Sequence, residues 1–455
     1  MRSVVIDRPV GVMALVVALG ASVLFNPGAS AQVLNQSEKL LPEDGAVSYQ
    51  FGWSVAIDDG LVAIGSVLAE VDGVRPGAVY LFDSADGAQS AKLVSDDTMH
   101  SDFFGAASAI DGGLLAVGAP FRSEGIGVAY LFETGTGDQS ATLLPSGPAV
   151  PDLFGIAIDI HDGVVAVGAS RSTINGTDSG AAFLFDAATG QQLHQLLPDD
   201  GAAGDYFGES IAIGGGLVAI GAFGTGDNGQ NSGSAYLFDV ATGAQVAKLL
   251  PDDGADGDTF GSAIAIDDGI VVVGARNDEV NGSDAGSVYL FDAASGQQLA
   301  KLLANDGAER DRFGSSVALD GGVVAVGAPN ANGDGSAYLF DVSTGAQLAT
   351  LLPGEGAGAA QFGFSIAIWD GMVVVGAPVD DENGPASGAA YLFDTNPCSP
   401  ADLAFPPGVL DFSDVATFLA AFGAMDPVAD LAPPLGVLDF SDAVIFLTAF
   451  GAGCP

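Results

Sequence analysis

Apolar and polar positions alternate in short runs along most of the chain, and the same order of runs returns about every 50 residues. In the fifth copy, the run Ser262–Ile266 is followed by the turn Asp267-Asp268-Gly269 and by a β-branched run at 270–275. A polar loop leads to a third run at 287–291, and another tight turn leads to a fourth run at 298–303. Short acidic-glycine turns between β-branched runs are typical of hairpins. Each copy therefore predicts four antiparallel strands.

Two motifs mark every copy in the same order. The first is Phe-Gly, at Phe51, Phe104, Phe154, Phe207, Phe260, Phe313 and Phe362. The second is an aromatic-Leu-Phe-acid tetrad, beginning at Tyr80, Tyr130, Phe183, Tyr236, Tyr289, Tyr338 and Tyr391. Seven units of four strands predict an all-β fold, a seven-bladed β-propeller with four-stranded blades.

The two ends of this array complement each other. The seventh unit stops after Tyr391-Leu392-Phe393-Asp394 and has no fourth run of its own. The segment Glu38–Pro42 matches the fourth runs of later units, such as Ala300–Leu303. We therefore expect an N-terminal strand to complete blade 7 and to close the ring, which removes the open ends of the array.

The repeat motifs resemble those of a known family. Phe-Gly-x-Ser-Val/Ile-Ala occurs at 51–56 and 207–212, and Val-Gly-Ala-Pro occurs at 117–120, 326–329 and 375–378. These stretches resemble the FG-GAP repeats of the integrin α-chain propeller and of many exported bacterial proteins. Calcium-binding members of that family carry a long Asp/Asn-rich loop between the first and second strands. Here that position holds three residues, which cannot wrap a cation that needs six to eight oxygens, so we expect turns there and no such calcium sites.

The N-terminus has the features of a secretory signal peptide. Arg2 and Arg8 precede an apolar run from Val10 to Phe25, which ends in Ala29-Ser30-Ala31. We expect residues 1–31 to be removed and the protein to be exported, to the cell surface, the periplasm or the extracellular space. No later segment is apolar and long enough for a transmembrane span.

A second, shorter duplication follows the array. The stretch beginning Ala401-Asp402-Leu403 returns at Ala429-Asp430-Leu431, and each half predicts one helix. The pattern resembles Cys-bounded dockerin-like modules, whose halves are EF-hand-like loops followed by helices. The resemblance implies a cohesin-like or envelope partner, and it makes six aspartates candidate metal ligands: Asp402, Asp411, Asp414, Asp430, Asp439 and Asp442.

The start of each EF-hand-like loop departs from that pattern. Ala404–Pro407 and Ala432–Leu435 replace two oxygen ligands in each loop, so calcium is possible but the motif is degenerate, and no cofactor is required. Cys398 and Cys454 are the only cysteines, and export permits a disulfide between them worth roughly 4 kcal/mol. The predicted organisation is a signal peptide at 1–31, a propeller at 32–396 and a dockerin-like module at 397–455.

The charge balance excludes one class of partner. The chain has 57 Asp and Glu against 12 Lys and Arg, a formal net charge of −45, so nucleic acid would be repelled. The acidity is compatible with a solvated surface, a high-salt setting or cation binding.

Basic residues are divided between two parts of the predicted blades. All arginines after the signal peptide fall on one rim, in loops between second and third strands or between blades: Arg75, Arg122, Arg171, Arg276, Arg310 and Arg312. Repeat length varies only in the segment between second and third strands, which is typical of a binding face. The arginines either dock an acidic or hydroxyl-rich ligand or pair with nearby aspartates. The lysines fall in outermost strands, where charge discourages edge-to-edge pairing: Lys39, Lys92, Lys248 and Lys301.

Catalytic motifs are weak. Gly314–Ala318 is close to a hydrolase nucleophile pattern, but the serine is alanine in three other blades and opens a strand, whereas a hydrolase elbow is a strand-to-helix turn. His100, His161 and His194 occupy unrelated blade positions and do not predict a metal cluster. We expect a non-catalytic binding or scaffolding protein for a protein or polysaccharide at the cell surface. The alternatives are a calcium-dependent adhesion protein and a carbohydrate-active propeller enzyme.

Overall fold

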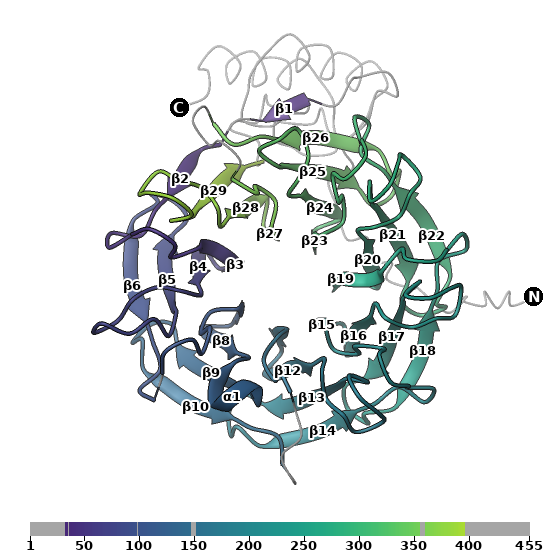
Figure 1. The fold of residues 1–455 in the computed structure, drawn as a ribbon, viewed down its shortest axis with the longest axis horizontal. Coiled ribbons are helices and arrows are strands. Elements are labelled where there is room, and N and C mark those ends of the chain that lie inside the picture. Colours follow the sequence, from purple (N-terminus) through teal and green to yellow (C-terminus); the bar gives the residue numbers. More distant parts are fainter. Residues whose placement is uncertain (1–31, 35, 98, 147–151, 355–359, 396–455) are drawn as a thin grey trace, which may run out of the picture. The chain divides into compact units, whose positions relative to one another are not determined.

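The computed structural model describes residues 32–34, 36–97, 99–146, 152–354 and 360–395. These residues form seven sheets, antiparallel except for one added edge strand, arranged in a ring around a central channel (Figure 1). The predicted signal peptide and dockerin-like module, with its six aspartates and two cysteines, lie outside the described residues.

Each blade runs from an innermost strand at the channel to an outermost strand at the circumference. Blade 1 contains β3 (Phe51–Asp58), β4 (Leu61–Ser66), β5 (Ala78–Asp83) and β6 (Gln89–Leu93). Blade 2 contains β7 (Ala107–Asp111), β8 (Leu114–Ala119), β9 (Val128–Glu133) and β10 (Gln139–Leu143). Blade 3 contains β11 (Ile158–His161), β12 (Val164–Ala169), β13 (Ala181–Asp186) and β14 (Gln192–Leu196). Blade 4 contains β15 (Ser210–Gly214), β16 (Leu217–Ala222), β17 (Ser234–Asp239) and β18 (Gln245–Leu249).

The remaining blades follow the same plan. Blade 5 contains β19 (Phe260–Asp267), β20 (Ile270–Ala275), β21 (Ser287–Asp292) and β22 (Gln298–Leu302). Blade 6 contains β23 (Ser316–Asp320), β24 (Val323–Ala328), β25 (Ser336–Asp341) and β26 (Gln347–Leu351). Blade 7 contains β27 (Ser365–Trp369), β28 (Met372–Ala377) and β29 (Ala389–Asp394). The short helix α1 (Arg122–Gly125), which the repeat pattern did not predict, lies in the loop between β8 and β9.

The N-terminal segment closes the ring as predicted. Strand β2 (Glu38–Leu40) pairs antiparallel with β29 and supplies the fourth strand of blade 7, with Lys39 opposite Tyr391. Strand β1 (Gln32–Leu34) was not predicted and pairs in parallel with β26, so blade 6 has five strands. One segment of nine residues therefore joins the outer edges of two neighbouring blades.

The acidic-glycine turns are tight hairpins, as their sequence predicts. Between β3 and β4, Asp59 and Gly60 both have positive φ angles, 45° and 76°, which is the conformation of a type I′ turn. Asp268 and Gly269 repeat this geometry in blade 5, with φ angles of 44° and 76°. The aspartates at these positions therefore serve to form the hairpin turns.

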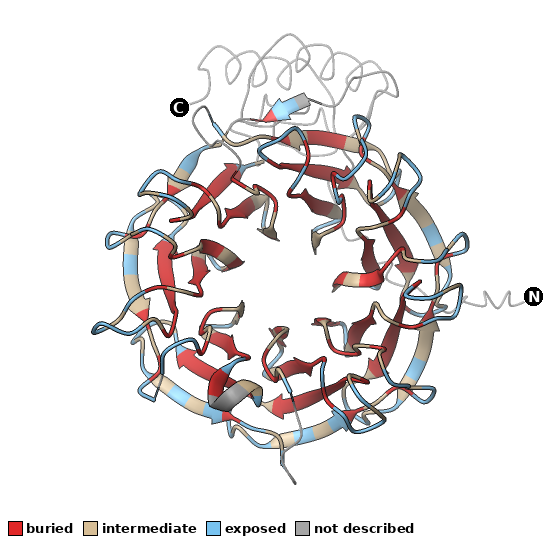
Figure 2. Ribbon diagram, in the orientation of Figure 1, coloured by how far each residue is buried: buried red, intermediate tan, exposed pale blue. Residues whose placement is uncertain are grey.

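The apolar core lies between neighbouring blades. The Phe of each Phe-Gly motif is buried against the aromatic tetrad of its own blade, as where Phe51 lies 5.5 Å from Tyr80 and 5.8 Å from Phe82 between ring centroids. One apolar cluster joins Ala63 and Leu81 of blade 1 to residues of blade 2, and the other clusters are shared in the same way. Figure 2 shows burial concentrated in the inner strands, while most residues of the outermost strands are intermediate or exposed. A ring of shared cores leaves the side chains of the loops free to vary.

A glycine before each third strand sets the distance between blades. Gly180 has a φ of 84° and lies so close to blade 4 that a Cβ atom would come 2.0 Å from the carbonyl oxygen of Phe207. Any side chain there would force the blades apart, so this position requires glycine.

Candidate functional site

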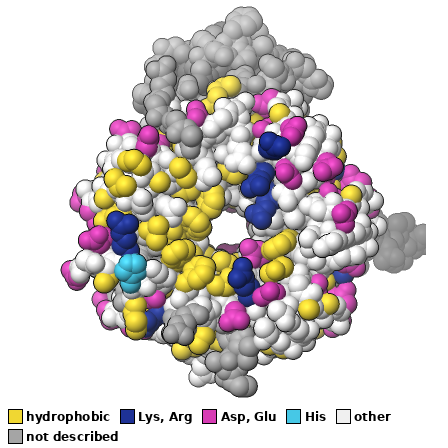
Figure 3. Space-filling view, viewed as in Figure 1, with side chains coloured by type: hydrophobic (Ala, Val, Ile, Leu, Met, Phe, Trp, Pro, Cys, Tyr) yellow, Lys and Arg dark blue, Asp and Glu magenta, His cyan; other side chains and the backbone are white. Residues whose placement is uncertain are grey.

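Loops from neighbouring blades meet on one rim of the propeller, the one that Figures 1 and 3 face. Backbone hydrogen bonds join the loop between blades to the loop between second and third strands. Ser101 N–H donates to the carbonyl of Arg75 at 2.9 Å, and Leu153 N–H donates to the carbonyl of Gly125 at 2.7 Å. The predicted loop rim is therefore a single continuous surface built from both kinds of loop.

The residue immediately before each Phe-Gly motif adopts a left-handed backbone conformation on this rim. Its φ angle lies between 54° and 63° in all seven blades: Gln50, Phe103, Leu153, Tyr206, Thr259, Arg312 and Gln361. For residues other than glycine this conformation costs on the order of 1 kcal/mol. Glycine would adopt it freely, yet the chain places seven side chains of six types there. The rim thus holds a ring of varied side chains in fixed, strained positions, a feature that the sequence motifs did not reveal.

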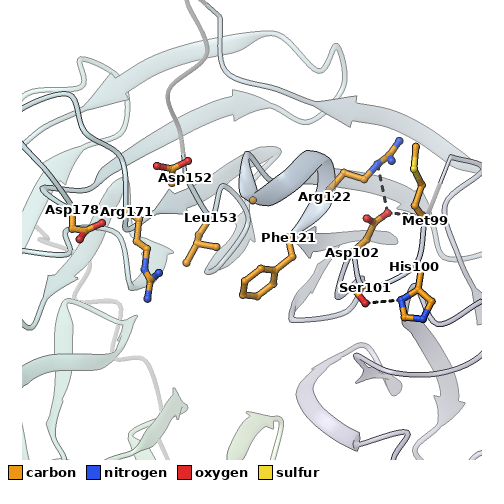
Figure 4. Close-up of a pocket in the computed structure, with 11 residues that line it drawn as sticks. Met99, His100, Ser101, Asp102, Phe121, Arg122, Asp152, Leu153, Arg171 and Asp178 are labelled. Atoms are coloured by element: carbon orange, nitrogen blue, oxygen red, sulfur yellow. Dashed lines mark hydrogen bonds and ion pairs between the residues drawn. The ribbon is translucent and has the colours of Figure 1, made fainter.

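Two hollows lie on the rim over blades 2 to 4, and we call them together the rim groove. The larger, of about 740 Å³, is lined by Phe121, Arg122, Leu153 and Arg171 among others. The smaller, of about 530 Å³, shares Leu153 and Arg171 with the first and adds residues of blade 4: Tyr206, Glu209, Phe223 and Asn231, with Ile156 of blade 3. In Figure 4, Phe121 and Leu153 lie between Arg171 and His100. The lining of the groove combines apolar residues with charged residues of both signs, among them Asp152, Asp178 and Glu209.

Aromatic side chains next to the Phe-Gly motifs pair with one another in several blades. Tyr206 and Phe223 stack with their ring centroids 4.9 Å apart and an angle of 6° between the planes. Phe103 contacts Phe121 at 4.8 Å, and Trp53 of blade 1 contacts Phe364 of blade 7 at 4.9 Å. Phe121 is 43% exposed. Figure 3 shows hydrophobic side chains on one side of the channel mouth and basic side chains on the other.

Three of the six predicted rim arginines pair with nearby carboxylates. Arg122 lies 2.8 Å from Asp97 and 3.6 Å from Asp102, and its side chain is only 10% exposed. Arg310 lies 3.5 Å from Glu309 and Arg75 lies 3.9 Å from Glu70, both at exposed positions. For these three arginines, the structure has the pairing with nearby acidic residues that was one of the two alternatives.

The other three rim arginines have no such partner. Within the part of the chain that the structure describes, no carboxylate lies within 4 Å of the guanidinium group of Arg171, Arg276 or Arg312. Figure 4 shows Arg171 extending away from both Asp152 and Asp178. The partly buried Arg276 has its pKa lowered by burial, against the attraction of Glu209, and Arg312 lowers it further.

Among the described carboxylates, Glu209 is the one whose charge acts on the pKa of Arg276. Burial raises the pKa of Glu209, while Arg276 and Arg171 counteract the rise. Glu209 interacts electrostatically with two guanidinium groups, those of Arg276 and Arg171, and Arg276 in turn is influenced by Arg312.

The lysines of the outermost strands do not extend from the outer edges into solvent. Each folds back over the tyrosine opposite it, and Lys301 Nζ lies 5.0 Å from the ring centre of Tyr289. Lys301 also contacts Asp253 at 2.7 Å and Asp278 at 2.8 Å, and the tyrosine hydroxyl donates to both carboxylates. The side chain of Lys301 is 17% exposed. Lys39, Lys92 and Lys248 repeat the arrangement in blades 7, 1 and 4.

The central channel offers little chemistry. Its hollow, of about 250 Å³, is lined mainly by Ala, Val and Ile of the innermost strands, and Asp159 is the one ionisable residue among the described residues that line it. Asp159 accepts backbone hydrogen bonds from Ile160 and Ile213, and burial raises its pKa to about 6. The serine of the nucleophile-like motif joins blades, since Ser316 donates to the carbonyl of Gly363 at 2.9 Å.

The three histidines lie in different elements, His161 at the end of β11, His194 in β14 and His100 in the connection between blades 1 and 2. His100 lies in the rim groove with Nδ1 2.6 Å from the hydroxyl of Ser101, but both residues are exposed. Asp102 instead accepts from the backbone of Met99 and faces Arg122. The described residues include no group of three His, Cys, Asp or Glu side chains placed to hold a metal ion.

Seven blades around a channel, each built on four antiparallel strands, together with a loop rim of variable length, define a β-propeller. The FG-GAP repeat pattern matches seven stretches of the chain, at residues 34–82, 88–132, 138–185, 191–238, 244–291, 297–340 and 346–393. The chain belongs to the FG-GAP repeat family. None of the curated proteins matches it. Among the described residues, no helix is long and apolar enough to cross a membrane.

Proposed function

We propose that this protein is an exported, non-catalytic binding protein that recognises a ligand or partner through the rim groove. The observation that carries the proposal is the groove itself, where the exposed side chain of Phe121 and the unpaired guanidinium group of Arg171 line one hollow. Exposed apolar surface rimmed by polar groups marks interaction sites. The strained residues of the rim support the same function, because they fix side chains before a ligand arrives.

A second part of the proposal concerns attachment. The Cys-bounded duplication at 397–455 resembles dockerin-like modules, and we infer that it holds the protein to the envelope or to another protein. The propeller needs no such segment to complete its sheets, because β2 already supplies the last strand of blade 7. Recognition and attachment are then tasks of different parts of the chain.

The groove is tested by placing a carboxylate in its apolar lining. Envelope material of the producing organism is cross-linked to the mature protein and to the variants Phe121→Asp and Val246→Asp. Val246 is a matched control, since it is 52% exposed, on the circumference, against 43% for Phe121 in the groove. We expect the partner recovered with wild type and with Val246→Asp to be lost with Phe121→Asp. Equal recovery with all three proteins would show that the groove is not the binding site.

A further inference from the structure

We propose that the open outer edges of blades 3, 4 and 5 bind an extended segment of another protein, which adds a strand to such an edge as β1 does to blade 6. This inference concerns the circumference of the propeller and is independent of the rim groove. Figure 1 shows the three outermost strands, β14, β18 and β22, following one another around the circumference.

The pairing of β1 with β26 shows what such an edge accepts. Strand β1 is three residues long and runs parallel to β26, with Gln32 opposite Ala349 and Leu34 opposite Leu351. Leu34 is 7% exposed, although its neighbour Val33 is 56% exposed. Main-chain pairing together with burial of alternate side chains is the way in which an extended peptide adds to a sheet edge. The edge of β26 is thus a site for an extended segment, and this chain fills it with its own N-terminal strand.

The outermost strands of blades 3 to 5 repeat the sequence pattern of β26 but carry no added strand. Each begins with Gln and ends with Leu, as β26 does, and each is the last strand of its sheet, so its outer edge has no partner among the described residues. The second residue of the strand differs sharply in exposure. In β26 this residue is Leu348 and is 7% exposed, whereas in the three open strands it is 44%, 52% and 53% exposed: Leu193, Val246 and Leu299. Exposed apolar side chains beside unpaired main-chain groups mark an edge that accepts a strand.

Features that usually protect a sheet edge are missing from these strands. A lysine that extends from an edge keeps other strands away, but Lys248 and Lys301 fold over tyrosines, and their side chains are only 19% and 17% exposed. None of the three strands contains Asp, Glu or Pro, on a chain with 57 acidic residues. These edges are therefore accessible to another strand and carry no acidic side chain of their own.

The net charge of the chain selects the occupant. Two copies of a chain with a net charge of −45 repel each other, which disfavours pairing between copies, and an acidic segment is repelled for the same reason. The strand that pairs with β26, Gln32–Leu34, is uncharged and two of its three residues are apolar. The partner that fits is therefore a neutral or basic extended segment of a different protein, rich in residues such as Val and Leu.

Blades 1 and 2 provide a comparison within the same molecule. Their outermost strands, β6 and β10, also begin with Gln, end with Leu and are the last strands of their sheets. Their second residue is a serine, Ser90 or Ser140, which offers an added strand no apolar contact. We therefore expect these two edges to bind a strand more weakly than the edges of blades 3 to 5.

The test uses the full mature chain and a fluorescein-labelled peptide in which Val and Leu alternate with Gln between terminal lysines. A matched peptide has Pro at its central positions, because Pro has no main-chain N–H and cannot extend a sheet, and another has Glu in place of Gln. Fluorescence anisotropy measures affinity, and hydrogen-exchange mass spectrometry locates the bound peptide. We expect the first peptide to slow exchange in β14, β18 and β22 and to leave β6 and β10 unchanged, while the Pro and Glu peptides bind weakly.

Variants of the second strand residue test the role of the apolar side chains. The triple variant Leu193→Ser/Val246→Ser/Leu299→Ser gives three edges the serine of blades 1 and 2, and it should weaken binding about tenfold. Ser140→Leu should extend protection to β10. Phe121→Asp should bind the peptide as wild type does, because the groove is a different surface. Val246→Asp alters one of the three edges and leaves the groove lining unchanged, so it remains the control for groove capture.

Thermal unfolding checks that each variant folds, and removal of residues 32–36 uncovers β26 and should add this strand to the protected set. Equal binding of the Pro peptide, equal protection of all five open edges, or unchanged affinity in the triple variant overturns the inference. So does protection of β26 in the deletion variant without protection of β14, β18 and β22 in the full chain. Sedimentation without peptide tests the other occupant, since a dimer that the triple variant loses would mean that a second copy covers these edges, which also overturns the inference.

Discussion

In blade 2, Thr142 occupies the strand position that a lysine holds in blades 1, 4, 5 and 7, opposite Tyr130. The loop residue Arg122 supplies the missing cation. Asp97 accepts from the hydroxyl of Tyr130 at 2.9 Å and from Arg122 at 2.8 Å, as Asp200 of blade 4 accepts from a tyrosine and a lysine. Arg122 thus has a structural role, although the sequence placed it with the candidate binding arginines.

The idea that Arg122 takes the place of a lysine at position 142 can be tested with a rescue variant. Arg122→Gln leaves the buried Asp102 and the half-exposed Asp97 without a cation and should lower the free energy of unfolding by about 2 kcal/mol. Adding Thr142→Lys should restore about half of the loss, because a lysine there can fold over Tyr130 toward Asp97. Denaturant unfolding of the two single variants and the double variant gives the coupling energy.

Additive effects in that cycle would mean that the two positions do not serve the same carboxylates. The Thr142→Lys variant alone is the control and should gain little, since Arg122 already neutralises Asp97.

The sequence identified the six rim arginines but not the division among them. Pairing depends on the partner side chains that neighbouring loops bring close. Arg122 pairs with Asp97 of the preceding connection between blades, whereas the nearby charge of Arg312 lowers the pKa of Arg276 further, after burial as the main cause. Distances of this kind across a repeat are set by the curvature of the ring. The left-handed residues before Phe-Gly were equally hidden, because their side chains have no common type.

At the level of elements, the N-terminal segment has two separate contacts. Strand β2 was predictable because Glu38–Leu41 repeats the pattern of other outermost strands. Strand β1 was not, since three residues carry no period or turn signal and parallel pairing depends on the edge they meet. Leu34 is 7% exposed, so this short strand still buries apolar surface.

Two nested deletions distinguish the contributions of these strands. Removing residues 32–36 takes away β1 alone and should lower the melting temperature by a few degrees, because only the outer edge of blade 6 is uncovered. Removing residues 32–42 also opens blade 7, exposes the edge of β29 and leaves Asp380, paired with Lys39 at 3.0 Å, without its cation. We expect a much larger fall and aggregation on heating. Equal melting temperatures for the full and the longer-deleted protein would contradict closure of the ring by β2.

At the scale of the whole molecule, the family repeat and the blade are out of phase. The matched stretch 88–132, for example, contains β6 of blade 1 and β7 to β9 of blade 2. Every repeat therefore crosses a blade boundary, and the first one, beginning at residue 34, supplies β2 to blade 7. Because each repeat binds two blades together, the ring is expected to unfold cooperatively and not blade by blade. The sequence alone predicts this architecture, because the number of motifs gives the number of blades and their spacing gives the blade boundaries.

The closed ring also predicts how the chain divides its tasks. All sheets of the propeller are complete by Asp394, so a protein truncated after that residue should fold, keep the binding of the rim groove and remain in solution. If residues 397–455 attach the protein, the truncated form should appear in the medium, and fusion of those residues to an unrelated exported protein should retain that protein at the envelope. Fractionation followed by immunoblotting measures both, and the melting temperature of the truncated form controls for folding. A truncated protein that stays at the envelope, together with a fusion that is released, would assign attachment to the propeller. The variant Phe121→Asp in the truncated form would then show whether the rim groove is the anchor, because loss of retention in that variant requires the groove to hold the envelope partner itself.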